Sequence, residues 1–207
     1  MHPNPIFRKE SEKRNISFVQ TRAFGTLTIN ADPAPLISHI PFILSDDGKR
    51  VEAHLVRSNP IARALRDGDI SAAIAVAGSD AYISPDWYGV DNQVPTWNYV
   101  AVHLRGTVRL LPQDDLLGIL ERISEAMETR LLPKKIWHHS KMSKDALEKM
   151  MRQIVPIEMD VETIDGTWKL NQNKSAEARL GAAEALENSE NGIGIREIAQ
   201  LMRDVED

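Results

Sequence analysis

The segment at residues 98–111, NYVAVHLRGTVRLL, places the tightest limit on what this chain can fold into. Its apolar residues recur at every second position, at Val100, Val102, Leu104, Val108 and Leu110. This period is typical of a half-buried strand, because successive side chains of a strand point to opposite faces. The segment is long, so we expect a bent strand with Gly106 as its kink or bulge. It predicts a fold built on a β-sheet.

Further strands are predicted for residues 24–29, 36–44, 50–57, 71–84 and 154–163, with 165–173 as the closing strand. Residue Gly78 is a candidate break in the fourth of these segments, and Asp47-Gly48 has the composition of a tight hairpin turn. Helices are expected at residues 6–20, 112–130, 143–154, 175–187 and 195–206. The pattern predicts a mainly β fold, an antiparallel barrel with added helices, comprising residues 1–187 and a helical tail at 188–207.

Composition excludes several classes of site. The 207 residues include no cysteine, which rules out disulfides, thiolate metal sites and cysteine nucleophiles. The formal net charge of -5 argues against direct DNA binding, because phosphate neutralisation needs a basic excess. The chain has neither an apolar leader at its start nor an apolar run of about 20 residues, so we expect a soluble cytoplasmic protein.

The segment HLVRSNPIARALRDG, at residues 54–68, is a candidate anion site. Ser58 and Asn59 are suited to cap a helix whose first residue is Pro60. The free N–H groups of that first turn, together with Arg57, would then converge on one point, as phosphate binding requires. The alternative is an ordinary capped helix beside a solvated arginine.

Aromatic residues crowd into one stretch of the chain. Five of the eleven lie within residues 82–99, at Tyr82, Trp87, Tyr88, Trp97 and Tyr99. In VPTWNY, residues 94–99, Thr96, Asn98 and backbone groups could hydrogen-bond the edge of a flat ring while Trp97 or Tyr99 packs against its face. Combined with a phosphate anchor, this predicts a site for a phosphorylated heterocycle. The alternative is a cluster that caps the end of the barrel, and SPDWYG at residues 84–89 favours a turn.

Other candidate sites carry weaker indications. The sequence contains no HxH, HxxxH or HExxH spacing, so no metal site is predicted. His138 and His139 are adjacent and would diverge on any regular element, so we expect them to have a loop or interface role. It also lacks the GxSxG, Walker and GxGxxG motifs. The polar strand end GTWKLNQN, residues 166–173, could reach a ligand or a partner subunit, or could simply be solvated. The last helix lacks the second helix of a DNA-binding helix-turn-helix, so we expect a packing or dimer helix.

Taken together, several motifs resemble the PaiB family of FMN-binding negative transcriptional regulators. They are FGTL at 24–27, SHIPF at 38–42, HLVRSNP at 54–60, AYISPDWY at 81–88, VPTWNYVAVHLRG at 94–106 and WKLNQN at 168–173. The resemblance covers about residues 1–185. It implies an FMN-binding split β-barrel similar to pyridoxamine 5′-phosphate oxidase, a homodimer, and a flavin mononucleotide site at the dimer interface.

The resemblance also implies roles for individual residues. Arg57, Ser58 and Asn59 fall where split barrels hold the flavin phosphate, and His39 and His54 lie on the two strands that flank the cofactor. Thr96, Trp97 and Asn98 belong to the PTWNY motif and would line the isoalloxazine ring. Lys169 and Gln172 lie near the C-terminal end, where related oxidases reach over the partner's site.

Three functions are compatible with these residues. The first is a dimeric FMN-binding regulator of transcription, acting on DNA or through a regulatory protein partner. The second is a flavin-dependent oxidoreductase of a small substrate, since the flavin itself carries hydride chemistry. The third is a barrel that has lost its cofactor and acts only through a partner. The sequence does not decide whether the protein is an enzyme, because it presents no defined set of acid, base and nucleophile.

Overall fold

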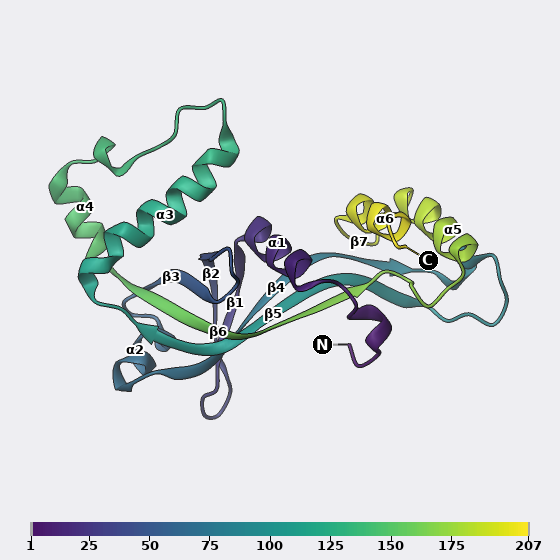
Figure 1. The fold of residues 1–207 in the computed structure, drawn as a ribbon, viewed down its shortest axis with the longest axis horizontal. Helices are drawn as coiled ribbons and strands as arrows, with labels where there is room; N and C mark the ends of the chain where they lie inside the picture. Colours follow the sequence, from purple (N-terminus) through teal and green to yellow (C-terminus); the bar gives the residue numbers. More distant parts are fainter. Residues whose placement is uncertain (1, 207) are drawn as a thin grey trace. The chain divides into compact units, whose positions relative to one another are not determined.

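The structure of the protein is a computed structural model that describes residues 2–206. Within these residues the strands are β1 (Phe24–Ile29), β2 (Leu36–Leu44), β3 (Arg50–Val56), β4 (Ile70–Ile83), β5 (Thr96–Leu110), β6 (Ile154–Lys169) and the short β7 (Gly192–Ile193). The helices are α1 (Glu12–Arg22), α2 (Pro60–Ala64), α3 (Leu116–Glu128), α4 (Lys144–Met151), α5 (Ala176–Glu187) and α6 (Ile195–Arg203) (Figure 1). The predicted mainly β class with added helices is confirmed. No helix in the described part of the chain has the length and apolar character needed to cross a membrane.

Six strands close into a ring. Their order is β1-β2-β3-β6-β5-β4, and β1 pairs with β4 as well as with β2, while β7 extends the sheet from β4. β1 is antiparallel to both of its neighbours, and β3 is antiparallel to both β2 and β6. Each of these six strands therefore has a hydrogen-bonded neighbour on both sides, which limits unwanted pairing with other chains.

The turn between β2 and β3 forms as its sequence predicts. Gly48 has a φ of 72°, the left-handed region that glycine occupies without a Cβ clash. The Asp47 carboxylate accepts hydrogen bonds from the Ser45 hydroxyl at 2.6 Å and from the Lys49 backbone N–H at 3.0 Å. These bonds fix the turn, and the turn fixes the register of β2 against β3.

Long strands replace several of the shorter segments expected. β4 runs through Gly78 without a break, and β6 joins two predicted strands into one of 16 residues. Gly106 lies within β5, and a Cβ there would sit 1.8 Å from the backbone oxygen of Asp160. Glycine is therefore required at this position by the close approach of two backbones. The first helix begins later than residue 6, because the Ser11 hydroxyl accepts a hydrogen bond from Arg14 N–H at 3.2 Å and caps it there.

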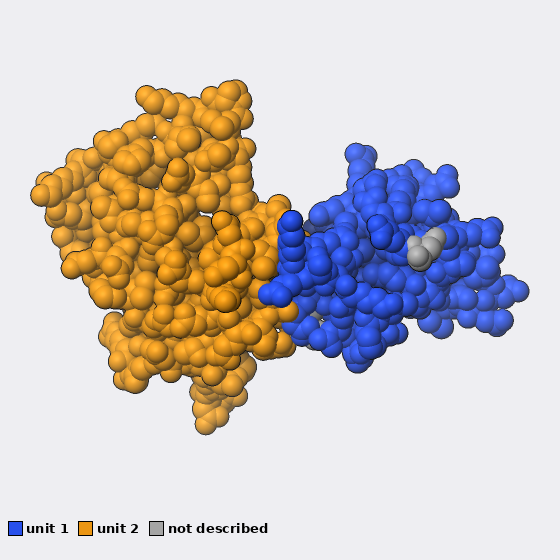
Figure 2. All heavy atoms as spheres, viewed as in Figure 1, with its two compact units in different colours: residues 1–15, 77–102, 165–207 blue, residues 16–76, 103–164 orange. Residues whose placement is uncertain are grey.

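The chain divides into two compact units, which Figure 2 shows in different colours. Unit 1 comprises residues 1–15, 77–102 and 165–207, and unit 2 comprises residues 16–76 and 103–164. The core of unit 2 includes Leu27, Ile40, Phe42, Leu55, Ile119 and Met159, with α3 packed on β2 and β3. The core of unit 1 includes Phe7, Tyr88, Trp168, Leu186, Ile198 and Met202.

The last two helices pack on each other within unit 1, where they lie side by side (Figure 1). The buried guanidinium of Arg179, on α5, donates through Nη1 to the backbone oxygens of Met202 at 2.7 Å and Val205 at 3.1 Å. These carbonyls lie at the end of α6, where a helix has no partners of its own for them. One buried side chain therefore fixes the end of the C-terminal segment against α5.

Candidate functional site

The ten residues predicted to contact a cofactor divide equally between the two units. Unit 2 contains His39, His54, Arg57, Ser58 and Asn59. Unit 1 contains Thr96, Trp97, Asn98, Lys169 and Gln172.

In unit 2, the predicted cap of α2 is confirmed. The Asn59 side-chain oxygen accepts a hydrogen bond from Ile61 N–H at 2.9 Å, and Pro60 occupies the first turn. The amide nitrogen of the same side chain donates to the Ser38 hydroxyl at 3.0 Å, which ties the cap to β2. Both ends of the Asn59 amide are thus used within the protein. Ser58, one residue earlier, is exposed.

The guanidinium of Arg57 already has several acceptors. Its Nε donates to the backbone oxygen of Arg152 at 2.9 Å, and its Nη2 donates to Gln113 Oε1 at 2.7 Å and to the backbone oxygen of Ile154 at 3.1 Å. These bonds hold the charge close to the N-terminal end of β6. They are made through Nε and Nη2, so a phosphate would have to bind through Nη1.

The two histidines of this set lie on the outward-facing side of their strands. The His39 ring nitrogen Nδ1 is 3.2 Å from the Thr26 hydroxyl, and its ring centre is 6.4 Å from that of Phe24. The Nδ1 atom of His54 is buried and has no hydrogen-bond partner among the described residues. Burial lowers the pKa of His54 below its ordinary value, because desolvation disfavours the charged ring. A neutral imidazole with a free nitrogen suits a ligand that donates or accepts one hydrogen bond.

In unit 1, the start of β5 separates the PTWNY side chains onto two faces. Thr96 and Asn98 share one face because side chains alternate along a strand, and Trp97 points to the other. Trp97 is exposed and contacts the Tyr82 ring edge-on, with 6.2 Å between the ring centres. The side chains of these three residues therefore do not all face one common point within the chain.

Asn98 is fully buried, and neither its amide oxygen nor its amide nitrogen has a hydrogen-bond partner among the described residues. Leaving one such group unsatisfied costs roughly 1–3 kcal/mol, so native proteins pair nearly all of them. A bound molecule that offers both a donor and an acceptor would satisfy the amide. The edge of an isoalloxazine ring offers both, so Asn98 fits the expected flavin.

The side chains of Lys169 and Gln172 differ in the hydrogen bonds that they make within the protein. The Lys169 ammonium donates to the Thr96 hydroxyl and lies 5.9 Å from the centre of the Phe7 ring. Partial burial lowers the pKa of Lys169, since desolvation disfavours the charged amine. The Gln172 amide instead braces its own turn, accepting from Leu170 N–H at 2.8 Å and donating to the Trp168 backbone oxygen.

The ten residues predicted from the sequence omit two features of the structure. Asn171 is buried with a φ of 64°, accepts a hydrogen bond from the Tyr88 hydroxyl at 3.4 Å, and has an amide nitrogen without a partner in the described chain. The predicted set also omitted His138 and His139, whose ring centres lie 4.2 Å apart and which both face Glu121. The histidines lie where a loop enters a short 3-10 turn, so the rule for regular elements does not apply.

Comparison with known proteins gives the following matches. Residues 1–163 match the model of a family described as "Putative FMN-binding domain". The "Protease synthase and sporulation protein PAI 2" of Bacillus subtilis is 33% identical over 206 residues, which cover 99% of this chain and 97% of that protein.

Two solved structures share the fold. The FAD and heme binding protein from Mycobacterium smegmatis matches with a TM-score of 0.59 and 16% identity, covering 90% of this chain and 82% of that one. The flavocytochrome Anf3 from Azotobacter vinelandii matches with a TM-score of 0.57 and 12% identity, covering 93% and 81%. At these identities the likeness concerns the fold alone.

Proposed function

Because this chain belongs to the FMN-binding family of the PaiB type, we propose that it is a homodimeric flavoprotein that regulates transcription through a protein partner. The family match confirms the predicted cofactor, FMN. The proposal extends this to the dimer, the regulatory role and the residues that contact the flavin. When bound, the flavin supplies hydride-transfer chemistry, and the protein supplies binding and orientation.

The observation that carries the proposed dimer is an uncovered apolar sheet face in unit 2. We call this the outer strand face and define it by Phe24, Ile37, His39 and Val56. The three apolar residues are 51%, 63% and 56% exposed, respectively. Their neighbours in sequence point to the opposite side, which is the core of the ring. An exposed apolar face of this kind is typical of a surface that contacts another protein, and here we assign a second copy of the chain.

In unit 2, we assign the flavin phosphate to Arg57, because of its positive charge, and to Ser58, because it is exposed. His39 and His54 would lie beside the cofactor, with the free Nδ1 of His54 available to it. In unit 1, the buried Asn98 amide and the Lys169–Thr96 pair are the proposed ring contacts. Asn59 and Gln172 would act by fixing the backbone of their turns, since their amides are already bonded.

The regulatory part of the proposal is supported by the relative in Bacillus subtilis, which is named for protease synthesis and sporulation. The net charge of -5 favours contact with a protein partner over direct contact with DNA. A promoter fragment should therefore not shift with the purified protein at low salt. Deleting the gene should change transcript levels, and a chain with a disrupted outer strand face should fail to restore them.

A flavin-dependent oxidoreductase is the second candidate, and Lys169 favours it. An amine whose pKa is lowered by burial can hold or release a proton closer to neutral pH than an ordinary lysine. In that case NADH or NADPH should reduce the bound flavin at an enzymatic rate. Lys169→Met should slow this reduction more than it weakens FMN binding. Failure of both nucleotides to reduce the flavin would favour the regulator.

The dimer is tested by light scattering on the purified chain. We expect a mass of twice 23.2 kDa for the natural protein and 23.2 kDa for the double variant Phe24→Asp, Ile37→Asp. Val94→Asp is the control, because Val94 is apolar and even more exposed (70%) but lies in unit 1. A natural protein with the monomer mass, or a dimeric double variant, would contradict the proposed interface.

The phosphate contact is tested by comparing FMN with riboflavin, which lacks the phosphate. Arg57→Ala should weaken FMN binding by about tenfold or more while leaving riboflavin binding nearly unchanged, because a charged hydrogen bond contributes roughly 1.5–3 kcal/mol. Arg66→Ala is the control for loss of one positive charge nearby in sequence. Equal losses for FMN and riboflavin would remove Arg57 from the phosphate site.

A further inference from the structure

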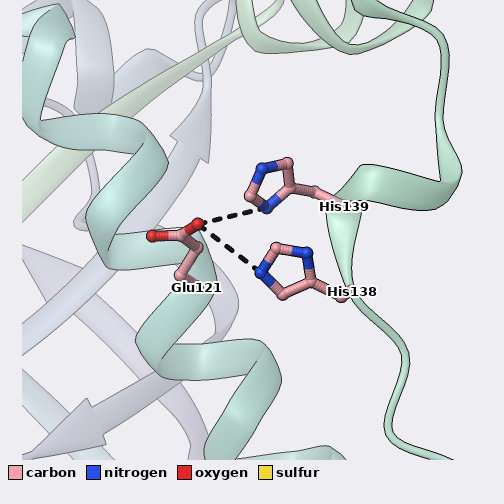
Figure 3. Close-up of side chains that lie close together, drawn as sticks. All are labelled: Glu121, His138 and His139. Atoms are coloured by element: carbon pink, nitrogen blue, oxygen red, sulfur yellow. Dashed lines mark ion pairs between the residues drawn. The ribbon is translucent and has the colours of Figure 1, made fainter.

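Glu121, His138 and His139 bring three potential metal ligands together in unit 2 (Figure 3). Their nearest ligand atoms all lie within 4.8 Å of one another. The Glu121 oxygen Oε1 is 3.1 Å from Nδ1 of His139 and 3.8 Å from Nε2 of His138. A tetrahedral zinc ion with bonds of about 2.0–2.1 Å would separate its ligand atoms by roughly 3.3 Å. The two separations from Glu121 lie on either side of that value.

The contact between His139 and Glu121 is not a hydrogen bond. Nδ1 of His139 is buried and has no hydrogen-bond partner within the described residues, although the carboxylate oxygen is only 3.1 Å away. The two atoms lie within ion-pair distance if the ring is protonated (Figure 3), and with a neutral ring both can be directed at an ion between them. A buried nitrogen of this kind requires a partner, and a metal ion would supply one.

The second histidine is held by its other ring nitrogen. Nδ1 of His138 lies 3.1 Å from the Ser140 hydroxyl and accepts from Ser140 N–H at 3.2 Å. With a metal on Nε2, the imidazole would carry its proton on Nδ1, so Nδ1 would give up the bond from Ser140 N–H and would donate to the Ser140 hydroxyl instead. Such a bond from the non-ligating nitrogen usually orients a metal-bound histidine.

The loop that carries the histidines is anchored to the end of α3. The Glu128 carboxylate accepts from Trp137 N–H at 2.7 Å and from the Lys134 ammonium. This contact places the backbone next to His138 against the helix that bears Glu121. The ligand set is therefore preorganised by backbone contacts and does not depend on two long flexible side chains finding each other.

The same three residues line a cavity of about 520 Å³ between α3, α4 and their connecting loop. Most of its remaining lining is apolar, and it includes Leu117, Leu120, Ile136, Met150 and Ile154. The side chains of Glu121, His138 and His139 are 44%, 58% and 25% exposed, respectively. A metal bound here would thus keep a coordination position open toward water or toward a molecule in the cavity.

We propose that Glu121, His138 and His139 bind a divalent transition-metal ion, with Zn²⁺ as the probe, and leave a fourth position open to the cavity. Two imidazoles and one carboxylate suit zinc better than calcium or magnesium, which prefer oxygen ligands. The ion would join α3 to the loop 132–143 and fix one wall of the cavity. The proposal is independent of the flavin residues.

The test is a Zn²⁺ titration of the full chain after treatment with a chelator, followed by calorimetry. We expect one zinc ion per chain. Glu121→Gln and His139→Ala should each weaken binding by at least about tenfold, since even outer-shell changes cost 10–100-fold. His2→Ala is the matched control, a histidine change in unit 1, and should bind zinc like the natural protein. Equal affinity in Glu121→Gln and the natural chain would overturn the proposal, as would an equal loss in His2→Ala.

A second readout protects the test against misfolded variants. Trypsin can cleave the loop after the exposed residues Lys134, Lys135 and Lys141. Zn²⁺ should slow this cleavage in the natural chain and leave it unchanged in His139→Ala, whose circular dichroism without metal should match the natural protein. Cleavage that zinc slows equally in both chains, or in neither, would contradict the assignment.

Discussion

Two asparagines show how differently the two units use the same side chain. At the start of α2 in unit 2, both ends of the Asn59 amide are bonded, to Ile61 N–H and to the Ser38 hydroxyl. At the start of β5 in unit 1, both ends of the Asn98 amide are buried and unpaired among the described residues. The first is a structural cap. The second has hydrogen-bonding capacity that the described fold does not use.

The difference indicates which polar residues to assign to a ligand. Arg57, like Asn59, stood out in the sequence as part of a phosphate site, yet three of its hydrogen bonds go to the protein itself. Asn98 and His54 have buried atoms without partners in the described chain, and an unpaired buried group destabilises a protein unless something binds it. We therefore expect the unsatisfied residues to respond to flavin more than Asn59, whose amide is bonded at both ends.

The largest expected effect is that of Asn98→Leu. The change replaces two unpaired polar groups with an apolar side chain of similar size, so the flavin-free protein should gain about 2 kcal/mol in free energy of unfolding. FMN binding should weaken by about tenfold or more, because the proposed ring contact is lost. Urea unfolding measures the change in stability, and an FMN titration measures the change in affinity. A destabilised variant that still binds FMN normally would abolish the distinction between Asn98 and Asn59.

Asn59→Ala should lower the stability of the protein, whereas Asn98→Leu should raise it, and the change should be smaller. Loss of the cap removes the hydrogen bond to Ile61 N–H and leaves Ser38 without its amide donor. The free energy of unfolding should fall by about 1 kcal/mol, the usual cost of losing an N-terminal cap. Asn59→Asp keeps the acceptor and should recover most of the loss. If Asn59→Ala left stability unchanged, the cap would not be structural.

The smallest expected effect is a pH dependence from His54. Burial sets its folded pKa below the ordinary value of 6.5, so the unfolded chain takes up a proton first as the pH falls. His54 should therefore add no pH dependence well above that value and should make stability fall as the pH drops below it. Urea unfolding at about pH 8 and about pH 5.5 measures this, and His54→Phe should reduce the difference. A difference that is the same in both proteins would mean that His54 titrates as it does in the unfolded chain.

The sequence predicted the strands well because their signals are local. Alternation marked β5, Asp47-Gly48 marked the hairpin, and Asn59-Pro60 marked the start of α2. The class of fold and the cofactor followed from motifs that keep the order and spacing of a known family. Both were then confirmed, by the fold and by the family match.

What the sequence could not predict depends on contacts between distant residues. Arg57 meets Arg152 across 95 positions, and Lys169 meets Thr96 across 73, so neither partner is visible locally. Asn98 is buried because it lies on the core side of β5, and strand propensity alone does not tell which side of a strand faces the core. The convergence of His138 and His139 on Glu121 depends on the irregular backbone of one loop.

The central claim is that this protein binds FMN and that the unsatisfied amide of Asn98 takes part. The most direct measurement is an FMN titration followed by flavin fluorescence, with the natural chain and Asn98→Leu side by side. We predict saturation at one FMN per chain for the natural protein, with clearly weaker binding by the variant. Flavin fluorescence and absorption that do not change when stoichiometric protein is added would contradict the claim.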